Sequence, residues 1–409
     1  MWFFAIVYAV EGIGQAKSGI IWQPLTYFLK ETQGWDPVKI SVSVAIFDLP
    51  WIIKPLWGAI SDFIPLFGYR RRPYLVIASI LGTLAFAQVA TLSTPSALIT
   101  AITLTSVAMA VSSTLCGALL VETGQKHDAS PGLVNQQWLF FNIAQMAAVL
   151  AAGGLIEILP PLGALHAAAW IAAAAPLFII ASVWLIEEKR SRIDLAALRG
   201  RLTALMSAFR NRKLWFVAGF LFLYHFSPGF GTPLYFQMTD RLGFSQGFIG
   251  ALTSISAGGW ILGGMLYRWR LHRLSSPALL RLSILGGVVT TLAFLLLSGP
   301  ASAVVIWLIT GTATMIATIA TMSLAAEACP EGAEGFAFAG LMSIVNFATP
   351  LGDTLGSALY EHVFDQHLAP LIILSAAATA LVFLLIPLLV FRKPAVSGMA
   401  CEAATTASD

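Results

Sequence analysis

The sequence predicts an all-α membrane protein whose twelve transmembrane helices form two halves of six. Hydrophobic residues make up 58% of the 409 residues and charged residues only 11%, against roughly 25% charged in soluble domains. Apolar runs of about 20 residues, long enough to cross a hydrocarbon core of about 30 Å, recur along the whole chain. These runs lack the alternation of barrel strands, so each is predicted to be a helix.

Twelve such runs are separated by short polar breaks. In chain order they are 2–29, 40–60, 73–93, 97–122, 133–158, 163–186, 214–236, 246–267, 278–298, 302–326, 335–360 and 369–391. The long break 187–213 divides the chain into halves 1–186 and 214–393, and 394–409 is expected to be a flexible cytoplasmic tail. Leu198, Leu202, Leu205 and Phe209 recur at helical spacing in the break, which favours an amphipathic surface helix over a plain solvated linker.

The basic residues predict the orientation of the chain. With both termini in the cytoplasm, 18 of the 23 lysines and arginines fall in cytoplasmic breaks, eight of them in 187–213. Basic breaks remain on the cytoplasmic side of a membrane. The net charge of +3 therefore reports topology, and we expect no nucleic-acid partner. The plasma membrane, a bacterial inner membrane, is the expected location.

Two six-helix halves joined by a basic linker are typical of the major facilitator architecture, whose halves enclose a midplane site and rock around it. The chain has no nucleotide-binding Gly-x-x-x-x-Gly-Lys loop, so ATP is not expected to drive it directly. It also has no evident nucleophile–base pair, cofactor loop or metal-ligand cluster. We therefore expect a secondary transporter of a small-molecule solute in a lipid bilayer, with protons as the coupling ion, and neither an enzyme nor a cofactor or metal protein.

Ionisable side chains inside the apolar runs are the first candidates for solute binding or coupling, because each costs about 2.5–3.5 kcal/mol at a helix centre. In a continuous helix over 2–29, the side chains of Glu11, Gln15 and Trp22 share one face, which should line the cavity. Lys17 lies off that face and should snorkel or pair elsewhere. For Glu11, simple hydration near the membrane face is an equal alternative to solute binding.

The second run carries Asp48 and Lys54. Six residues place them on different faces, so each needs another partner. Lys54 precedes Pro55, which removes an amide donor and can kink the helix. We favour a structural role for Lys54 slightly over a role in solute binding.

The stretch "YHFSPGFGTP" at 224–233 predicts a broken helix, because two prolines and two glycines interrupt it. Broken helices at membrane depth often line a transport site. Tyr224 and His225 precede the break and are candidates. His225 is either a proton relay or a neutral histidine bonded to a backbone carbonyl.

Two later runs add further candidates. Asn142 either binds a polar solute or joins helices through a hydrogen bond. Asn346 and Asp353 share a face of the eleventh run, where Asp353 is either a coupling group or a structural hydrogen-bond partner. Gly352 and Gly356 form a small-xxx-small pair that favours close packing of a neighbouring helix.

The stretch "LPWIIKPLWGAISDFIPLFGYRRRPYL" at 49–75 resembles the signature of the folate-biopterin transporter family of the major facilitator superfamily. So do "YFQMTDRLGFSQGFIGALTSISAGGWILGGMLY" at 235–267 and "CPEGAEGFAFAGLMSIVNF" at 329–347. The resemblance reaches from about Tyr8 to about Tyr360. It implies proton-coupled transport of a folate- or biopterin-type organic anion by alternating access.

The resemblance also assigns roles to particular residues. Gly58, Asp62, Arg70, Arg71 and Arg72 match a loop that latches helix ends during the conformational change. In "GALLVE", Glu122 is retained, whereas Gly117 stands where the family has an aspartate.

Two other functions remain open. The Gly117 departure favours a transporter of an unrelated small metabolite. A sister family of similar fold would suggest a non-transporting membrane factor for pigment or complex assembly, although "PEGAEGFAFAGLMSIVN" matches the folate-biopterin group better.

Overall fold

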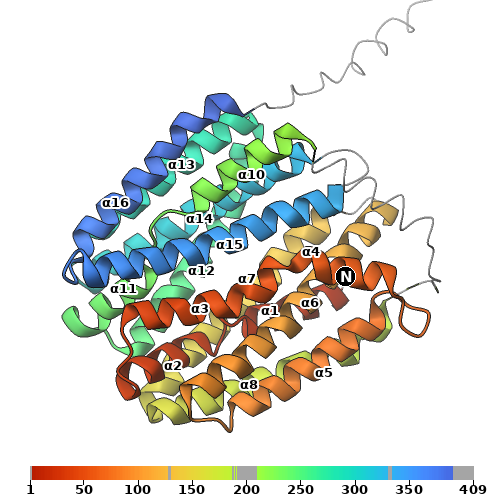
Figure 1. Ribbon diagram of the computed structural model, residues 1–409, viewed down its shortest axis with the longest axis horizontal. Helices are drawn as coiled ribbons and strands as arrows, with labels where there is room; N and C mark the ends of the chain where they lie inside the picture. The colour runs from red at the N-terminus through yellow and green to blue at the C-terminus, as the bar shows by residue number, and fades with distance from the viewer. Residues whose placement is uncertain are drawn as a thin grey trace, which may run out of the picture.

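The computed structural model describes residues 2–127, 130–186, 188, 190, 210–329 and 334–389 (Figure 1). Within these ranges the chain is helical, and its only β pairing is an isolated bridge between Leu66 and Tyr69. This confirms the all-α prediction. The predicted surface helix at 198–209, most of the linker 187–213 and the tail 394–409 lie outside the described residues.

The first half holds six crossings, two of which are interrupted. Its elements are α1 (Trp2–Gly14), α2 (Trp22–Tyr27), the π-helical turn η1 (Phe28–Thr32), α3 (Pro37–Ile52), α4 (Lys54–Phe63), α5 (Arg72–Val89), α6 (Pro95–His127), α7 (Ser130–Ile158), α8 (Pro161–Ser182) and η2 (Val183–Leu185). The first crossing consists of α1, α2 and η1, and the second of α3 and α4. The kink expected near Lys54 and Pro55 is present, because α3 ends one residue before Ile53 and α4 begins one residue after it.

The second half repeats this plan. Its elements are α10 (Arg212–His225), α11 (Gly231–Phe236), the π-helical turn η3 (Gln237–Arg241), α12 (Gln246–Trp269), η4 (Leu271–Arg273), α13 (Ser276–Ala293), η5 (Phe294–Leu296), α14 (Pro300–Ala328), α15 (Glu334–His362), α16 (Leu368–Leu381) and η6 (Val382–Leu388). The break predicted between 224 and 233 is confirmed, because α10 ends at His225 and α11 begins at Gly231.

Nine helices of the described chain are long and apolar enough to cross a membrane unaided. The other three crossings are α1–α2 and α10–α11, whose helices are separated by several residues, and α15. Together they give the twelve crossings that the sequence predicts. In α1–α2 and α10–α11 each helix stops midway, so that neither piece alone is long enough to cross a membrane. Interrupted helices of this kind are expected to line a site.

The two halves meet along two helix pairs. α3 packs against α15, and α7 packs against α12. In Figure 1 the red-to-yellow helices of the first half and the green-to-blue helices of the second lie on opposite sides of the α3–α15 contact. One apolar core fills the first half, and two clusters fill the second.

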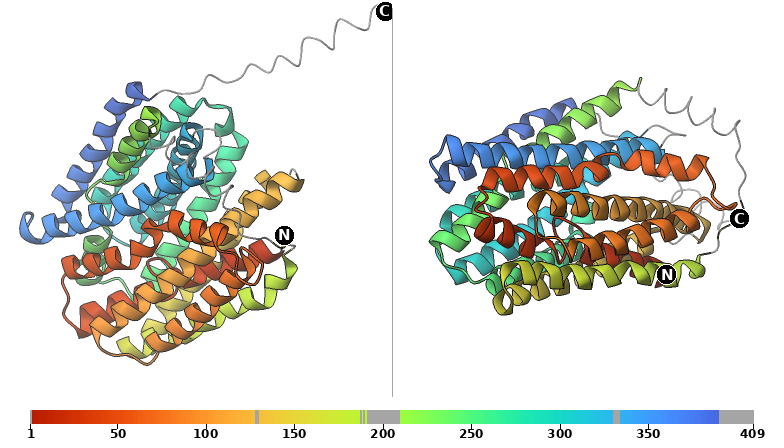
Figure 2. Two further views of the ribbon diagram at one scale, coloured as in Figure 1. Left: turned by 45° about the vertical axis from the view of Figure 1, so that its right-hand side comes forward. Right: turned by 60° about the horizontal axis from the view of Figure 1, so that its bottom comes forward.

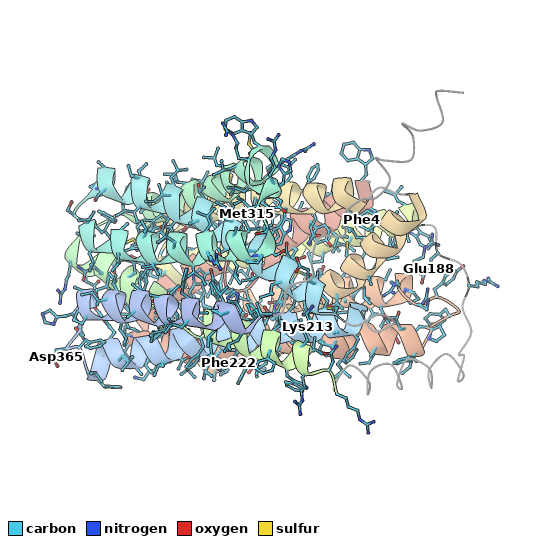
Figure 3. The ribbon with its side chains drawn as sticks, turned by 90° about the horizontal axis from the view of Figure 1, so that it is seen from above. Phe4, Glu188, Lys213, Phe222, Met315 and Asp365 are labelled. Atoms are coloured by element: carbon cyan, nitrogen blue, oxygen red, sulfur yellow. The ribbon has the colours of Figure 1, made fainter. Side chains whose placement is uncertain are left out.

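The helices run alongside one another between two ends of the molecule (Figure 2). Figure 3 shows Glu188 at one end and Asp365 at the other. We call these the Glu188 end and the Asp365 end. The Glu188 end carries the loop between α4 and α5, and the Asp365 end carries the loops 33–36 and 242–245.

One expectation about the first crossing is wrong. The polar stripe of Glu11, Gln15 and Trp22 assumed a continuous helix, but α1 ends at Gly14 and α2 begins only at Trp22. The backbone folds so tightly here that a Cβ on Gly19 would lie 2.2 Å from the carbonyl oxygen of Ile13. Because the helix stops, the 100° rotation per residue does not apply between these side chains.

The broken crossings repeat each other at an offset of 209 residues. Trp22, where α2 begins, corresponds to Gly231, where α11 begins, and the π-helical turns begin at Phe28 and Gln237. Each is followed by a glycine with positive φ, Gly34 or Gly243. The two halves therefore share the arrangement of their first crossings.

Candidate functional site

An ion pair at the break of the first crossing is the centre of the candidate site. The Lys17 ammonium lies 2.7 Å from Asp48 Oδ2 on α3. The Asp48 side chain is only 3% exposed, whereas the Lys17 side chain is 34% exposed. Asp48 therefore has the separate partner that it was expected to need. Lys17 belongs to the site, although the sequence analysis left it out because it lies off the face of the assumed continuous helix.

Lys17 also faces acidic and titratable groups of the second half. It lies within electrostatic range of Asp353 on α15 and of His225 at the end of α10. The Nε2 atom of His225 is buried and has no hydrogen-bond partner, so a carbonyl does not hold this nitrogen. Sequence reasoning chose Asp48, His225 and Asp353 from three distant runs, and the fold pairs Asp48 with Lys17 and brings the other two within electrostatic range of it.

Asp353 is held by the broken backbone of the seventh crossing. A Cβ on Gly229 would lie 1.8 Å from Asp353 Oδ1, and one on Gly356 would lie 1.8 Å from the carbonyl oxygen of Gly229. The Gly229 N–H donates to the carbonyl of Gly352 at 3.0 Å. The close packing predicted for the Gly352–Gly356 pair is therefore present, and its partner is the break itself.

A second polar chain lies in the first half. Lys54 Nζ donates to Ser113 Oγ at 3.3 Å, and Ser113 Oγ donates to Glu11 Oε1 at 3.1 Å. The Lys54 ammonium also lies 4.5 Å from the ring centroid of Trp51. Glu11 Oε2 is buried without a hydrogen-bond partner. The Ser113 hydroxyl on α6 therefore bridges Glu11 and Lys54. Sequence reasoning missed Ser113 because an uncharged serine in an apolar run does not carry the high burial cost that marked the charged candidates.

Two asparagine candidates have different positions. Asn346 on α15 donates through Nδ2 to the carbonyl of Trp51 at 3.0 Å, so it joins the two halves. Asn142 is 3% exposed and donates to the carbonyl of Trp138 on its own helix, while its Oδ1 is buried without a partner.

The remaining candidates are less central. Gln15 Oε1 accepts the hydroxyl of Ser18, and Trp22 packs against the core of the first half. Tyr224 packs against a core cluster of the second half and stacks on Phe220 at 6.1 Å. Glu122 lies on α6, but its side chain is outside the described residues.

The loop at the Glu188 end contains the expected acid–base pair. Arg71 Nη2 donates to Asp62 Oδ1 at 3.0 Å, and Arg70 Nη1 lies 3.9 Å from the same oxygen. A Cβ on Gly58 would lie 3.6 Å from Thr114 Cγ2, which is an ordinary contact. Gly58 is therefore not required for the packing of α4 against α6 at this point.

Glu188 is an unexpected member of this loop. Its Oε1 accepts the backbone N–H groups of Arg70 and Arg71, both at 2.8 Å, and its Oε2 accepts that of Arg72 at 3.0 Å. A carboxylate at the N-terminus of α5 is favoured because unpaired amides and the helix dipole meet there. An acidic residue directly after the sixth crossing is the signal that could have indicated it.

Polar contacts join the halves at the Asp365 end. Lys30 after α2 lies 2.5 Å from Asp240 Oδ1, and Gln23 Nε2 donates to the carbonyl of Gln246 at 2.7 Å. Nearer the middle, the Ser41 hydroxyl lies 2.7 Å from that of Ser357. These contacts hold the halves together at this end in the observed conformation.

The arrangement of the crossings matches solved transporter structures. The inward-open xylose transporter XylE from E. coli superposes with a TM-score of 0.73 at 12% identity, covering 96% of each chain. The nucleoside transporter NupG superposes with a TM-score of 0.66 at 15% identity, covering 96% of this chain and 99% of that one. The protein is therefore a multi-pass integral membrane protein with the major facilitator fold.

Sequence comparison gives the family. The BT1 family model matches residues 13–405. A folate-biopterin transporter of Synechocystis sp. is 27% identical, covering 92% of this chain and 78% of the relative. A probable folate-biopterin transporter 6 of Arabidopsis thaliana is 25% identical, covering 88% and 75%. The chain belongs to the BT1 family, the folate-biopterin transporters, so it is a membrane transporter and not an enzyme.

Proposed function

We propose that the protein is a proton-coupled secondary transporter that carries a folate- or biopterin-type organic anion across the plasma membrane by alternating access. The solute class is supported by the names of its relatives. The observation that carries the mechanism is the Lys17–Asp48 ion pair, placed between broken crossings and within range of Asp353 in the other half. Major facilitator proteins bind solutes between their halves.

Charge balance in the membrane supports proton coupling. The central groups comprise two ammonium groups, Lys17 and Lys54, and three carboxyl groups, Glu11, Asp48 and Asp353. Fully ionised, they leave one excess negative charge, and an uncompensated charge within a bilayer is costly. A proton on one carboxyl removes that charge. It also weakens the hold of the acids on Lys17, which can then bind a solute carboxylate.

The two ends of the molecule provide the alternation. We assign the Glu188 end, with the arginines of the loop between α4 and α5, to the cytoplasm. The Asp365 end is then the outer face, closed in the observed conformation by Lys30–Asp240 and Gln23–Gln246. Asp62 and Arg71 act as the latch at the cytoplasmic end. Asp62→Asn should lower transport while leaving solute binding largely unchanged.

The test is uptake into proteoliposomes of purified protein. Biopterin and folate uptake should increase when the lumen is more alkaline than the outside, and Asp353→Asn should abolish that increase while retaining exchange of internal for external solute. Asp365→Asn, at an exposed position in a loop, is the control. Uptake that does not respond to the imposed pH gradient would exclude proton coupling. If no pterin is taken up, the proposed solute class is excluded.

A small metabolite unrelated to the pterins is the second candidate, and Gly117 favours it. A Cβ on Gly117 would have Tyr8 Oη as its nearest neighbour, at 4.0 Å, so a side chain fits there without displacing the backbone. Gly117→Asp should therefore fold and add a carboxylate beside Tyr8. If this variant raises folate uptake relative to the uptake of other anions, the wild-type protein prefers a solute other than folate. An unchanged preference would count against this candidate.

A further inference from the structure

The junction between α12 and α13 carries a group of exposed arginines. It lies at the Glu188 end, because α12 starts from the loop at the Asp365 end and crosses the molecule. Arg268 and Arg270 lie at the end of α12, Arg273 lies in the turn η4, and Arg281 lies in the second turn of α13. All four side chains are exposed, and they are the only charged residues between positions 242 and 326. We call them the junction arginines.

Core packing fixes the direction in which the junction faces. Tyr267 and Leu271 pack against an apolar cluster of the second half. Between them, the Trp269 side chain is 69% exposed, and the Arg270 guanidinium lies 4.8 Å from the centroid of its ring. Because Tyr267 and Leu271 hold the inner side of the chain here, Trp269 and Arg270 form a cation–π pair on the outer side.

Both helices present apolar side chains to the outside next to the junction. Leu262 and Met265 of α12 are 47% and 63% exposed, and Leu285 and Val289 of α13 are 60% and 56% exposed. In a membrane crossing, exposed apolar side chains face the acyl chains of lipids. Arg281 lies four residues before Leu285 and eight before Val289, so it shares their face of α13. Its guanidinium therefore projects from a surface that faces lipid.

The corresponding loop of the first half, between α4 and α5, contains its own carboxylates. Asp62 pairs with Arg71, and Glu188 accepts the backbone N–H groups of residues 70–72. Within the described part of the chain, in contrast, no junction arginine forms an ion pair. Glu327, the next acidic residue of the chain, accepts the hydroxyl of Ser276. The described residues therefore supply no counter-ion to the junction arginines.

We propose that the junction arginines and Trp269 bind the headgroup of an anionic phospholipid. A guanidinium donates paired N–H groups to a phosphate, and tryptophan favours the headgroup level of a bilayer. The apolar faces of α12 and α13 accommodate the acyl chains, which a free phosphate ion lacks. The Glu188 end is the one assigned to the cytoplasm, where the leaflet is rich in anionic lipids. This site is separate from the Lys17 site and does not depend on which solute is carried.

The experiment is quenching of Trp269 fluorescence by brominated phospholipids in bilayers that contain phosphatidylglycerol and phosphatidylcholine. The Trp269 signal is the difference between the wild type and Trp269→Phe. Phosphatidylglycerol should bind beside Trp269 at least fivefold more strongly than phosphatidylcholine, since each basic residue near an anionic surface contributes roughly fivefold. Arg268→Gln combined with Arg270→Gln should reduce this preference to less than twofold. Arg273→Gln combined with Arg281→Gln should also reduce it and is measured if the first pair does not fold.

Arg210→Gln combined with Arg212→Gln is the matched control. This pair removes the same charge at the same end, from exposed positions where α10 begins. It should leave the preference for phosphatidylglycerol at Trp269 unchanged. Equal binding of the two lipids to the wild type, an unchanged preference in the variant of Arg268 and Arg270, or an equal loss in the control would overturn the proposal.

Competition with soluble glycerol phosphate separates a lipid site from a site for free phosphate. Glycerol phosphate should displace brominated phosphatidylglycerol from Trp269 no more than sodium chloride of equal ionic strength does, because salt screens exposed charges in either case. Greater displacement by glycerol phosphate would assign the junction arginines to a soluble phosphate compound and overturn the lipid site.

Discussion

The carboxylate of Asp353 lies directly against the backbone of Gly229, where a Cβ would be 1.8 Å from Asp353 Oδ1. No side chain other than hydrogen fits between them. The broken seventh crossing and α15 therefore hold Asp353 in one place, near Lys17 of the other half.

Gly229→Ala should consequently displace Asp353 and lower both stability and transport. Overpacking of a close contact typically costs about 1–3 kcal/mol, so the melting temperature in detergent should fall by several degrees. Gly231→Ala is the control, because a Cβ there has no neighbour within 4 Å. Equal melting temperatures for the two variants would contradict the contact.

The Lys17–Asp48 pair should be strongly coupled. Asp48 is buried and Lys17 is 34% exposed, so removing either partner leaves the other charge uncompensated, at the larger cost where the buried Asp48 is the one that remains. Lys17→Met and Asp48→Leu should each destabilise the protein more than the double variant does. Thermal unfolding of the four proteins provides the cycle, and additive losses would show that the pair has no coupling energy.

Lys30 and Asp240 should control opening at the Asp365 end. Asp240→Asn should increase the fraction open at that end, since the contact crosses the halves at 2.5 Å. Spin labels on the loops 33–36 and 242–245 would report longer distances. Lys39→Met, which removes an ion pair within the first half alone, should leave those distances unchanged.

Glu188 should stabilise the loop between α4 and α5. Glu188→Ala leaves three backbone N–H groups without their acceptor, and losing a helix N-cap costs about 1 kcal/mol. Amide hydrogen exchange in residues 70–72 should accelerate. Arg190→Ala, at an exposed neighbouring position, should leave that exchange unchanged, and slow exchange in Glu188→Ala would contradict the cap.

Asp36 should give a pH-dependent contribution at the Asp365 end. Burial alone would raise the pKa of Asp36, but hydrogen bonds from the Lys39 N–H and ammonium outweigh it and lower the pKa. Its stabilisation is therefore present above the ordinary value of 3.8 and is lost as pH falls through the lower folded value. Asp36→Ala should cost about 1 kcal/mol at neutral pH, and the difference from wild type should vanish in strong acid.

Composition and run length were sufficient to predict the crossings, because the bilayer imposes helices of set length. The break before Gly231 was predictable from Pro228 and Gly229. The break after Gly14 was not, because no proline falls between Gln15 and Ile21 and the tight turn at Gly19 is evident only from the folded backbone. Residue spacing along the sequence does not predict which side chains share a face where the helix stops.

The site residues were predictable singly but not as partners. The cost of a buried charge pointed to Asp48, His225 and Asp353, and the fold brings them around Lys17. Lys17 was misplaced because the helix was assumed to be continuous. Glu188 and Lys30 were missed because their roles arise only when segments more than 100 residues apart meet.

The π-helical turns at Phe28–Thr32 and Gln237–Arg241 occupy equivalent positions in the two halves. A π turn within an α-helix accommodates one additional residue. Each turn begins four residues after a proline, Pro24 or Pro233, and the glycine of the following loop, Gly34 or Gly243, lies ten residues after that proline. The ion pair of Lys30 with Asp240 therefore joins equivalent turns of the two halves.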